Sequence, residues 1–132
     1  AVKKLQKEKG IKKILIVDND SDIRALVSLT LMANPDYQIL EAEDGLKGLE
    51  IARRDKPDFI LLDVRMPQMD GNEVCRQLKS YPDTKKIKIL MLSGLDDEEE
   101  RKQGLEAGAD DYFTKPFRPT HLLRKISEML LD

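Results

Sequence analysis

The sequence has little cysteine and no long apolar segment. Cys75 is its one cysteine, so no disulfide can form within the chain, as is usual in a reducing cytoplasm. The longest stretch without a charged residue, 25–35, is well short of the ~18 apolar residues that a membrane-spanning helix needs. Residues 1–13 are polar and lack the apolar segment of a secretory signal. We therefore expect a cytoplasmic protein that does not enter a membrane.

Basic residues are scarce relative to acidic ones over most of the chain. The net charge is −2, but residues 1–13 carry +5, which leaves −7 for residues 14–132. Because nucleic-acid affinity depends on Lys and Arg side chains that displace counterions, we expect no direct nucleic-acid binding by the folded part. A length of 132 residues, 40% of them apolar, suits one domain. We expect a basic tail or linker over 1–10 and the domain over 11–132.

Five short segments of apolar, β-branched and aromatic residues have the pattern of β-strands. They are 13–17, 38–42, 58–62, 87–92 and 111–114. Three of them are nearly continuous apolar runs, which is typical of strands covered by helices on both faces. Stretches of helix length, with apolar residues three and four apart, lie between them. The alternation predicts a single-domain, doubly wound α/β fold, (βα)5, with right-handed crossovers and a mostly parallel five-stranded sheet.

Polar residues mark the starts of the predicted helices. Side chains suited to N-caps precede the first four helices, and Pro119 suits the first turn of the fifth. These N-caps are Asp20 or Ser21, Asp44, Asp70, and Asp96, the last paired with Glu99 in a capping-box pattern. We interpret the acidic run 96–100 as a solvated helix start that the helix dipole favours.

Polar residues also follow four of the five predicted strands. Ligands of a parallel α/β sheet bind beyond the carboxyl ends of its strands, so these residues should converge. Carboxylates tolerate close contact when a hard divalent cation, Mg²⁺ or Mn²⁺, lies between them. The converging residues are Asp18, Asn19 and Asp20 after the first strand, Asp63 after the third, Ser93 after the fourth and Lys115 after the fifth.

Such a set of side chains can accept a phosphoryl group. With a cation bound, one carboxylate attacks phosphorus, the cation and Lys115 neutralise the equatorial oxygens, and Ser93 donates a hydrogen bond to one of them. Asp63 is the better candidate for the nucleophile because it follows a buried central strand and stands alone. Asp18 and its neighbours are suited to holding the cation. The product is an acyl phosphate.

Four strings of the sequence resemble those of response regulator receiver domains of the chemotaxis-protein (CheY-like) type. They are ILIVDND (14–20), LLDVRMPQMDG (61–71), MLSG (91–94) and GADDYFTKPF (108–117), and the resemblance extends over about 11–132. It implies a flavodoxin-like fold with strand order 2-1-3-4-5. It also implies a phosphorylation-activated switch of a two-component system or phosphorelay, not a turnover enzyme. The phosphoryl donor would be a histidine kinase or a phosphotransfer protein.

The resemblance also assigns roles to individual positions. Asp63 becomes the phosphoacceptor, and Lys115, followed by an expected cis bond to Pro116, contacts the phosphoryl group. Ser93 and Tyr112 become the switch hydroxyl and the switch aromatic. An output domain or protein would bind the face made by the fourth helix, the fifth strand and the fifth helix. The metal ligands, for Mg²⁺ or Mn²⁺, become Asp18, Asn19, Asp63 and the backbone carbonyl of Arg65.

Asn19 departs from the family pattern, which has a directly ligating Asp at this position. An amide oxygen can ligate Mg²⁺ but brings no negative charge. We therefore expect a weakened but detectable Mg²⁺ dependence, with the field of Asp20 compensating in part.

Two other functions fit parts of the pattern. Residues 18–20 have the Asp-x-Asp spacing of aspartate-dependent phosphohydrolases, with Asp18 as nucleophile and Asp20 as acid and base. Against this alternative, the chain has no spare length for a substrate cap domain, and Asp63 is left unexplained. A flavodoxin-like module that binds FMN is disfavoured, because carboxylates stand after the first strand where that site needs hydroxyl and glycine donors. Mapping an acyl phosphate to Asp63 or to Asp18 separates the first two readings.

Overall fold

The structure, a computed structural model, describes residues 10–94 and 98–131. Over these ranges, parallel strands alternate with helices along the chain. The strands are β1 (Lys12–Val17), β2 (Tyr37–Ala42), β3 (Phe59–Asp63), β4 (Lys88–Ser93) and β5 (Asp111–Thr114). The helices are α2 (Ser21–Leu31), α3 (Gly45–Asp55), α4 (Gly71–Ser80), α5 (Glu98–Glu106) and α6 (Pro119–Leu130). The strand order is β2-β1-β3-β4-β5, which confirms the predicted fold.

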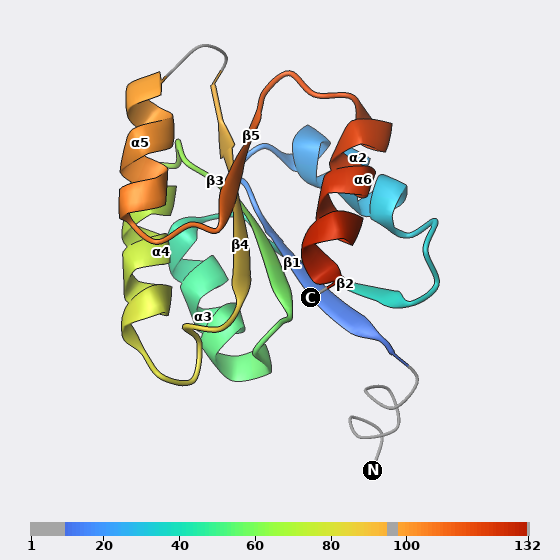
Figure 1. Ribbon diagram of the computed structural model, residues 1–132, viewed down its shortest axis with the longest axis horizontal. Helices are drawn as coiled ribbons and strands as arrows, with labels where there is room; N and C mark the ends of the chain where they lie inside the picture. Colours follow the sequence, from blue (N-terminus) through green and yellow to red (C-terminus); the bar gives the residue numbers. More distant parts are fainter. Residues whose placement is uncertain (1–9, 95–97, 132) are drawn as a thin grey trace.

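Helices cover both faces of the sheet. Figure 1 shows α3, α4 and α5 on one face and α2 and α6 on the other. Successive residues of β3 point to opposite faces: Ile60 and Leu62 pack in the core under α3 and α4, whereas Phe59 and Leu61 pack under α2 and α6. All five β3 residues are buried. Since burying one such apolar side chain contributes ~1.5–3 kcal/mol, both cores depend on the continuous apolar run that the sequence displays.

The helix starts agree with the predicted caps wherever the structure describes them. Of the two candidates for α2, Asp20 is the N-cap, and Asp44 and Asp70 cap α3 and α4. Pro119 lies in the first turn of α6. The predicted cap Asp96 lies outside the described residues. None of the helices within 10–94 and 98–131 has both the length and the apolar character needed to cross a membrane.

Two predicted strand ends differ from the structure by one residue. Asp63 and Ser93 were expected just beyond their strands, but each is the last residue of its strand. The reason is that both still take part in the sheet: Asp63 pairs with Leu92, and Ser93 pairs with Thr114. Both side chains therefore begin from rigid backbone at the carboxyl edge of the sheet.

Candidate functional site

Three of the predicted site residues meet at the carboxyl edge of the sheet. Lys115 Nζ lies 3.1 Å from Asp18 Oδ2 and 3.2 Å from Asp63 Oδ1, and it donates a hydrogen bond to each. Asp18 is fully buried and Asp63 is 5% exposed. The bond between Lys115 and Pro116 is cis, as expected. The structure therefore brings together a lysine and two carboxylates from the ends of β1, β3 and β5.

An open cleft of about 550 Å³ lies over these side chains. Its volume lies within the range of small-molecule sites, about 300–1,000 Å³, and charged residues dominate its lining. The lining residues are Asp18, Asn19, Asp20, Asp63, Arg65, Gly94, Glu100 and Lys115. The residues predicted to hold a metal therefore share one cavity with the predicted phosphoacceptor.

The carboxyl group of Asp63 has a pKa well above the ordinary value for aspartate. Burial, followed by the charge of Asp18, raises the pKa of Asp63 from 3.8 to about 6. The Lys115 ammonium and a backbone hydrogen bond from Arg65 oppose this rise but do not cancel it. A cation bound beside Asp18 and Asp63 would offset their mutual repulsion and favour the ionised carboxylate of Asp63.

Lys115 keeps its charge in this setting. Burial opposes ionisation of Lys115, but the carboxylates of Asp63 and Asp18 outweigh that effect and hold its pKa above the ordinary 10.5. A permanently charged ammonium between two carboxylates is suited to neutralising an oxyanion that develops beside them.

Asp18 is oriented by contacts to the first helix. Its Oδ1 accepts the backbone N–H of Asp20 at 2.9 Å, and Arg24 donates through Nη1 to the Asp18 carbonyl at 2.7 Å. Arg24 Nε also lies 3.4 Å from Glu41 Oε1 on β2. The role of Arg24 was not predicted from the sequence. The one indication in the sequence is that this basic residue lies on the otherwise apolar inner side of the predicted helix.

The turn into α4 packs directly against the backbone of Asp63 and Val64. Gly71 donates its N–H to the Val64 carbonyl at 2.9 Å. A Cβ added at Gly71 would lie 2.3 Å from the Asp63 carbonyl oxygen, which is far closer than real contacts allow. Glycine is therefore required here, because the start of α4 approaches the backbone of the predicted phosphoacceptor directly.

Ser93 occupies the end of β4, next to the residue that pairs with Asp63. It is 2% exposed, and its Oγ has no hydrogen-bond partner among the residues that the structure describes. Leaving a buried hydroxyl unsatisfied costs about 1–3 kcal/mol. Ser93 is not among the residues that line the cleft, but its hydroxyl is a donor that would gain from an acceptor placed within its reach.

Tyr112 does not line this cleft. It is half-buried on β5, and the guanidinium of Arg101 lies 4.6 Å from the centre of its ring. Arg101 Nη2 also lies 3.3 Å from Thr114 Oγ1 on the same strand. Tyr112, the predicted switch aromatic, thus makes a cation–π contact with Arg101 of α5, and the sequence did not indicate this contact.

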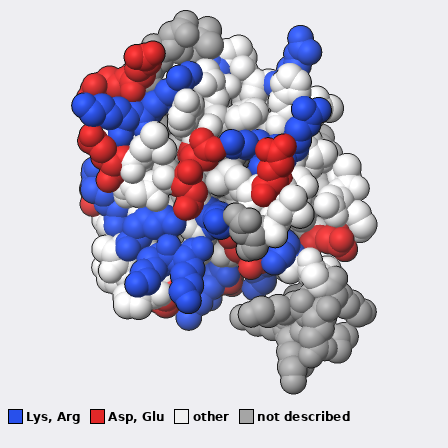
Figure 2. Space-filling view, in the orientation of Figure 1, with Lys and Arg blue, Asp and Glu red and all other residues white. Residues whose placement is uncertain are grey.

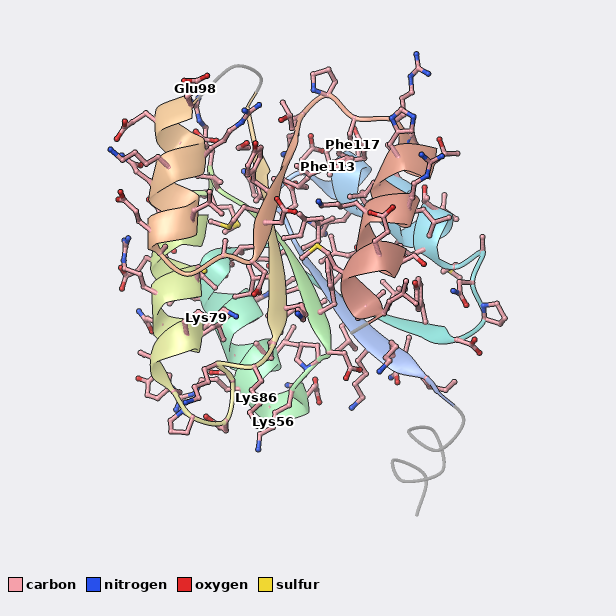
Figure 3. All side chains as sticks on the ribbon, viewed as in Figure 1. Lys56, Lys79, Lys86, Glu98, Phe113 and Phe117 are labelled. Carbon is pink, nitrogen blue, oxygen red and sulfur yellow. The ribbon has the colours of Figure 1, made fainter. Side chains whose placement is uncertain are left out.

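Glu100 corrects the interpretation of the acidic run. We expected 96–100 to be a solvated helix start; Glu98 and Glu99 are exposed, but Glu100 is 8% exposed. Figure 2 shows acidic side chains over the start of α5. Figure 3 labels Glu98, the first residue of this helix. Glu100 instead accepts hydrogen bonds from Arg65 Nε at 2.9 Å and from the Gly94 N–H at 3.0 Å. Residues 96 and 97 lie outside the described ranges.

The donor set of the cleft has the chemistry that Mg²⁺ prefers, which is oxygen only. Two carboxylates, Asp18 and Asp63, stand close enough to share the Lys115 ammonium, and Asn19 and Arg65 line the same cavity. Within 10–94 and 98–131, no three His, Cys, Asp or Glu side chains are grouped so that they could hold a metal. Asn19, which lines the same cavity, offers an amide oxygen that carries no charge.

Comparisons with known proteins identify the family of the chain. The sequence model of the response regulator receiver domain matches residues 14–127. The chain belongs to the response regulator receiver domain family. Receiver domains are signalling modules of two-component systems, are generally phosphorylated with the help of Mg²⁺, and work with histidine kinases and output domains.

Curated relatives include response regulators of mycobacteria. The receiver domain is 46% identical over 118 residues to the response regulator MprA of Mycobacterium leprae, a match that covers 89% of this chain and 50% of that protein. MprA of Mycobacterium ulcerans is 44% identical over the same length. The chain therefore spans about half the length of the curated relatives it matches.

Solved structures with the same fold include a response regulator, a chemotaxis protein and a receiver domain. A putative response regulator from Chloroflexus aurantiacus superposes with a TM-score of 0.87 at 33% identity, covering 92% of this chain and 99% of that one. The chemotaxis protein CheY4 of Vibrio cholerae gives 0.83 at 34% identity, covering 89% and 98%. The DrrB receiver domain, solved in a form activated by BeF₃, gives 0.83 at 33% identity, covering 92% and 99%.

Proposed function

We propose that this receiver domain is a switch that is activated when Asp63 accepts a phosphoryl group from the phosphohistidine of a histidine kinase or a phosphotransfer protein. The observation that carries the proposal is the position of the Asp63 carboxylate, at the floor of an open cleft, hydrogen-bonded to Lys115 and beside Asp18. A carboxylate so placed is accessible to a donor yet already paired with the cation that a phosphoryl transfer requires.

The transfer step follows from these positions. A carboxylate oxygen of Asp63 attacks phosphorus, the bond from phosphorus to the donor nitrogen breaks, and the imidazole leaves with the bonding electron pair. Lys115 remains charged throughout and neutralises an equatorial oxygen of the transferring group. The product is an acyl phosphate on Asp63, and Asp18 keeps the Lys115 ammonium in place after Asp63 has reacted.

Mg²⁺ or Mn²⁺ would bind to the carboxylates of Asp18 and Asp63, the amide oxygen of Asn19 and the carbonyl of Arg65. When bound, the ion screens the two carboxylates from each other and stabilises the negative charge on the phosphoryl oxygens. Asn19 supplies an oxygen without charge, so we propose that affinity for the ion is weaker than an Asp at this position would give. Asp20 lines the same cavity and adds only its field, because its side chain caps α2.

The output of the switch is proposed to be the face formed by α5, β5 and α6. Among the described residues the buried Ser93 hydroxyl has no hydrogen-bond partner, so a phosphoryl oxygen would give it an acceptor. Movement of Ser93 towards that oxygen leaves space that Tyr112 can fill. Beside Tyr112, a groove of about 460 Å³ runs along β5 and the start of α6. Figure 3 shows Phe113 and Phe117 side by side there, with ring centres 6.1 Å apart.

The phosphohydrolase alternative has less support. It requires Asp18 as nucleophile and Asp20 as acid and base. Asp18 is fully buried, whereas Asp63 keeps 5% of its surface exposed, and the two Asp18 oxygens accept hydrogen bonds from Lys115 and from the Asp20 N–H. The Asp20 Oδ1 accepts the N–H groups of the first turn of α2, so this carboxylate is engaged as a cap. We therefore propose a signalling role without turnover of an external substrate, and a cytoplasmic location, which suits the free thiol of Cys75.

Intact-mass measurement after incubation with acetyl phosphate and Mg²⁺ tests the proposal. Wild-type protein should gain the mass of one phosphoryl group, and the gain should disappear on chelation of the metal. Asp63→Asn should gain none. A modified Asp63→Asn protein, with wild-type extent and rate, would overturn the assignment of Asp63.

A further inference from the structure

Glu100 is a buried carboxylate that joins three parts of the molecule. It belongs to the first turn of α5, and its Oε2 lies 2.9 Å from Arg65 Nε in the segment that follows β3. Its Oε1 accepts the Gly94 N–H, just beyond the end of β4, at 3.0 Å. Glu100 thereby links α5 to the segments that follow the strands of Asp63 and Ser93.

Both donors that Glu100 engages also line the cleft above Asp63. Arg65, Gly94 and Glu100 share that cavity with Asp18, Asp63 and Lys115. A guanidinium and a backbone N–H that converge on one anion are the donors that phosphoryl oxygens select. In the unmodified protein, these two donors are occupied by a carboxylate of the chain itself.

We propose that Glu100 is an internal competitor of the phosphoryl group: it holds the Arg65 guanidinium and the Gly94 N–H until phosphorylation of Asp63 displaces it and frees α5. The inference rests on the proposed function, because it concerns how that modification reaches the output face. It assigns Glu100 a positioning role, since Glu100 acts through the two donors and not on the reacting atoms.

Charge favours the displacement. A phosphoryl group carries about −1.5 to −2 and three acceptor oxygens, against −1 and two oxygens for Glu100. The cleft already contains the carboxylates of Asp18, Asp20 and Asp63 beside Glu100. Further negative charge on Asp63 therefore repels Glu100 while it attracts the same Arg65 and Gly94 donors. The exchange needs no ligand beyond those of the phosphorylated site itself.

The packing of α5 makes the exchange consequential. The buried residues of α5 are Glu100 and Gly104, and Leu105 on the same helix is 47% exposed. A helix with so little buried apolar surface depends on its polar ties more than the other helices do. The neighbouring Arg101 binds the Tyr112 ring, so release of this turn also loosens the contact that holds Tyr112 in its present position.

The test compares Glu100→Gln with Glu99→Gln, a matched control that removes the same charge from the exposed adjacent position. Beryllofluoride with Mg²⁺ serves as the phosphoryl mimic, and its affinity is measured by titration. Because an amide is a weaker acceptor than a carboxylate, Glu100→Gln should bind beryllofluoride roughly 5- to 10-fold more tightly than wild type. Glu99→Gln should match wild type.

The NMR resonance of the Gly94 amide distinguishes competition for this donor from a general effect of removing a negative charge. Without beryllofluoride, this resonance should differ between wild type and Glu100→Gln, because the acceptor differs. With beryllofluoride bound, the two resonances should coincide, because the mimic is the acceptor in both proteins. Should Glu100→Gln fail to fold, Glu100→Asp retains the charge but shortens the reach, and the same tightening and convergence are expected.

The outcomes distinguish failure of the role of Glu100 from failure of the function proposed for Asp63. If wild type binds beryllofluoride but Glu100→Gln behaves like Glu99→Gln, the role of Glu100 is refuted while the function of Asp63 stands. Gly94 resonances that stay different after saturation also refute the competition. If wild-type protein binds no beryllofluoride and takes no phosphoryl group, the proposed function itself has failed.

Discussion

Replacing Asp63 with Asn is expected to stabilise the fold at neutral pH. Burial and the charge of Asp18 raise the pKa of Asp63 from 3.8 to about 6, so the folded protein favours the neutral carboxyl. Between these two values the folded state binds more protons than the unfolded state, and the free energy of unfolding therefore falls as the pH rises. The asparagine variant carries no proton to lose and escapes this loss.

The magnitude follows from the pKa values. Each tenfold difference in proton affinity corresponds to ~1.4 kcal/mol, so moving the pKa of Asp63 from 3.8 to about 6 costs wild type ~3 kcal/mol once the carboxyl is ionised. Asp63→Asn should thus unfold with a free energy up to ~3 kcal/mol higher at pH 7.5, whereas near pH 4 the two proteins should differ little. Lys115 keeps a carboxylate partner in the variant, because Asp18 remains.

Urea unfolding at pH 4, 6 and 7.5, with a chelator present, measures this dependence. Asp83→Asn is the control, because Asp83 is exposed, and its effect should stay within ~0.5 kcal/mol at every pH. An Asp63→Asn variant that is less stable than wild type at pH 7.5, or equally stabilised at pH 4 and 7.5, would refute the electrostatic reasoning.

Three further results are expected. Asn19→Asp should bind Mg²⁺ roughly tenfold more tightly in a calorimetric titration, because it adds a charged ligand, and an unchanged affinity would count against Asn19 as a ligand. Gly71→Ala should lower the free energy of unfolding by about 1–3 kcal/mol, because its Cβ meets the Asp63 carbonyl. Gly94→Ala should not, because its Cβ meets no atom of the described residues within 4 Å. Equal losses in the two variants would contradict the contact at Gly71. In an NMR titration, the side-chain carboxyl of Asp63 should show a pKa of about 6 without metal and a lower pKa with Mg²⁺, because the cation favours the ionised form. A pKa that Mg²⁺ leaves unchanged would argue against metal binding at Asp63.

The sheet and the convergence of the site could be predicted from the sequence because both follow from local pattern. Apolar runs such as 59–62 require cover on both faces, and this requirement dictates a parallel sheet between helix layers. In such a sheet all the strands end at one edge, which brings Asp18, Asp63 and Lys115 together although they are up to 97 residues apart. The N-caps followed from residue type alone.

The role of Glu100 could not be predicted in the same way. Three consecutive glutamates, 98–100, are chemically identical, and only the rotational phase of α5 decides which of them turns inward. Gly104 and Ala107, four and seven residues further on, mark that inner face by their small size, but an apolar pattern is almost absent from this helix. The contact of Arg101 with Tyr112 could not be predicted, because it joins side chains of α5 and β5 and depends on how these two elements pack together.

Locating the acyl phosphate on the chain tests the central claim most directly. After reaction with acetyl phosphate and Mg²⁺, hydroxylamine converts an acyl phosphate into a hydroxamate, and peptide sequencing by mass spectrometry identifies the residue that carries it. We expect a hydroxamate at Asp63 and none at Asp18. A hydroxamate at Asp18, with Asp63 unmodified, would contradict it.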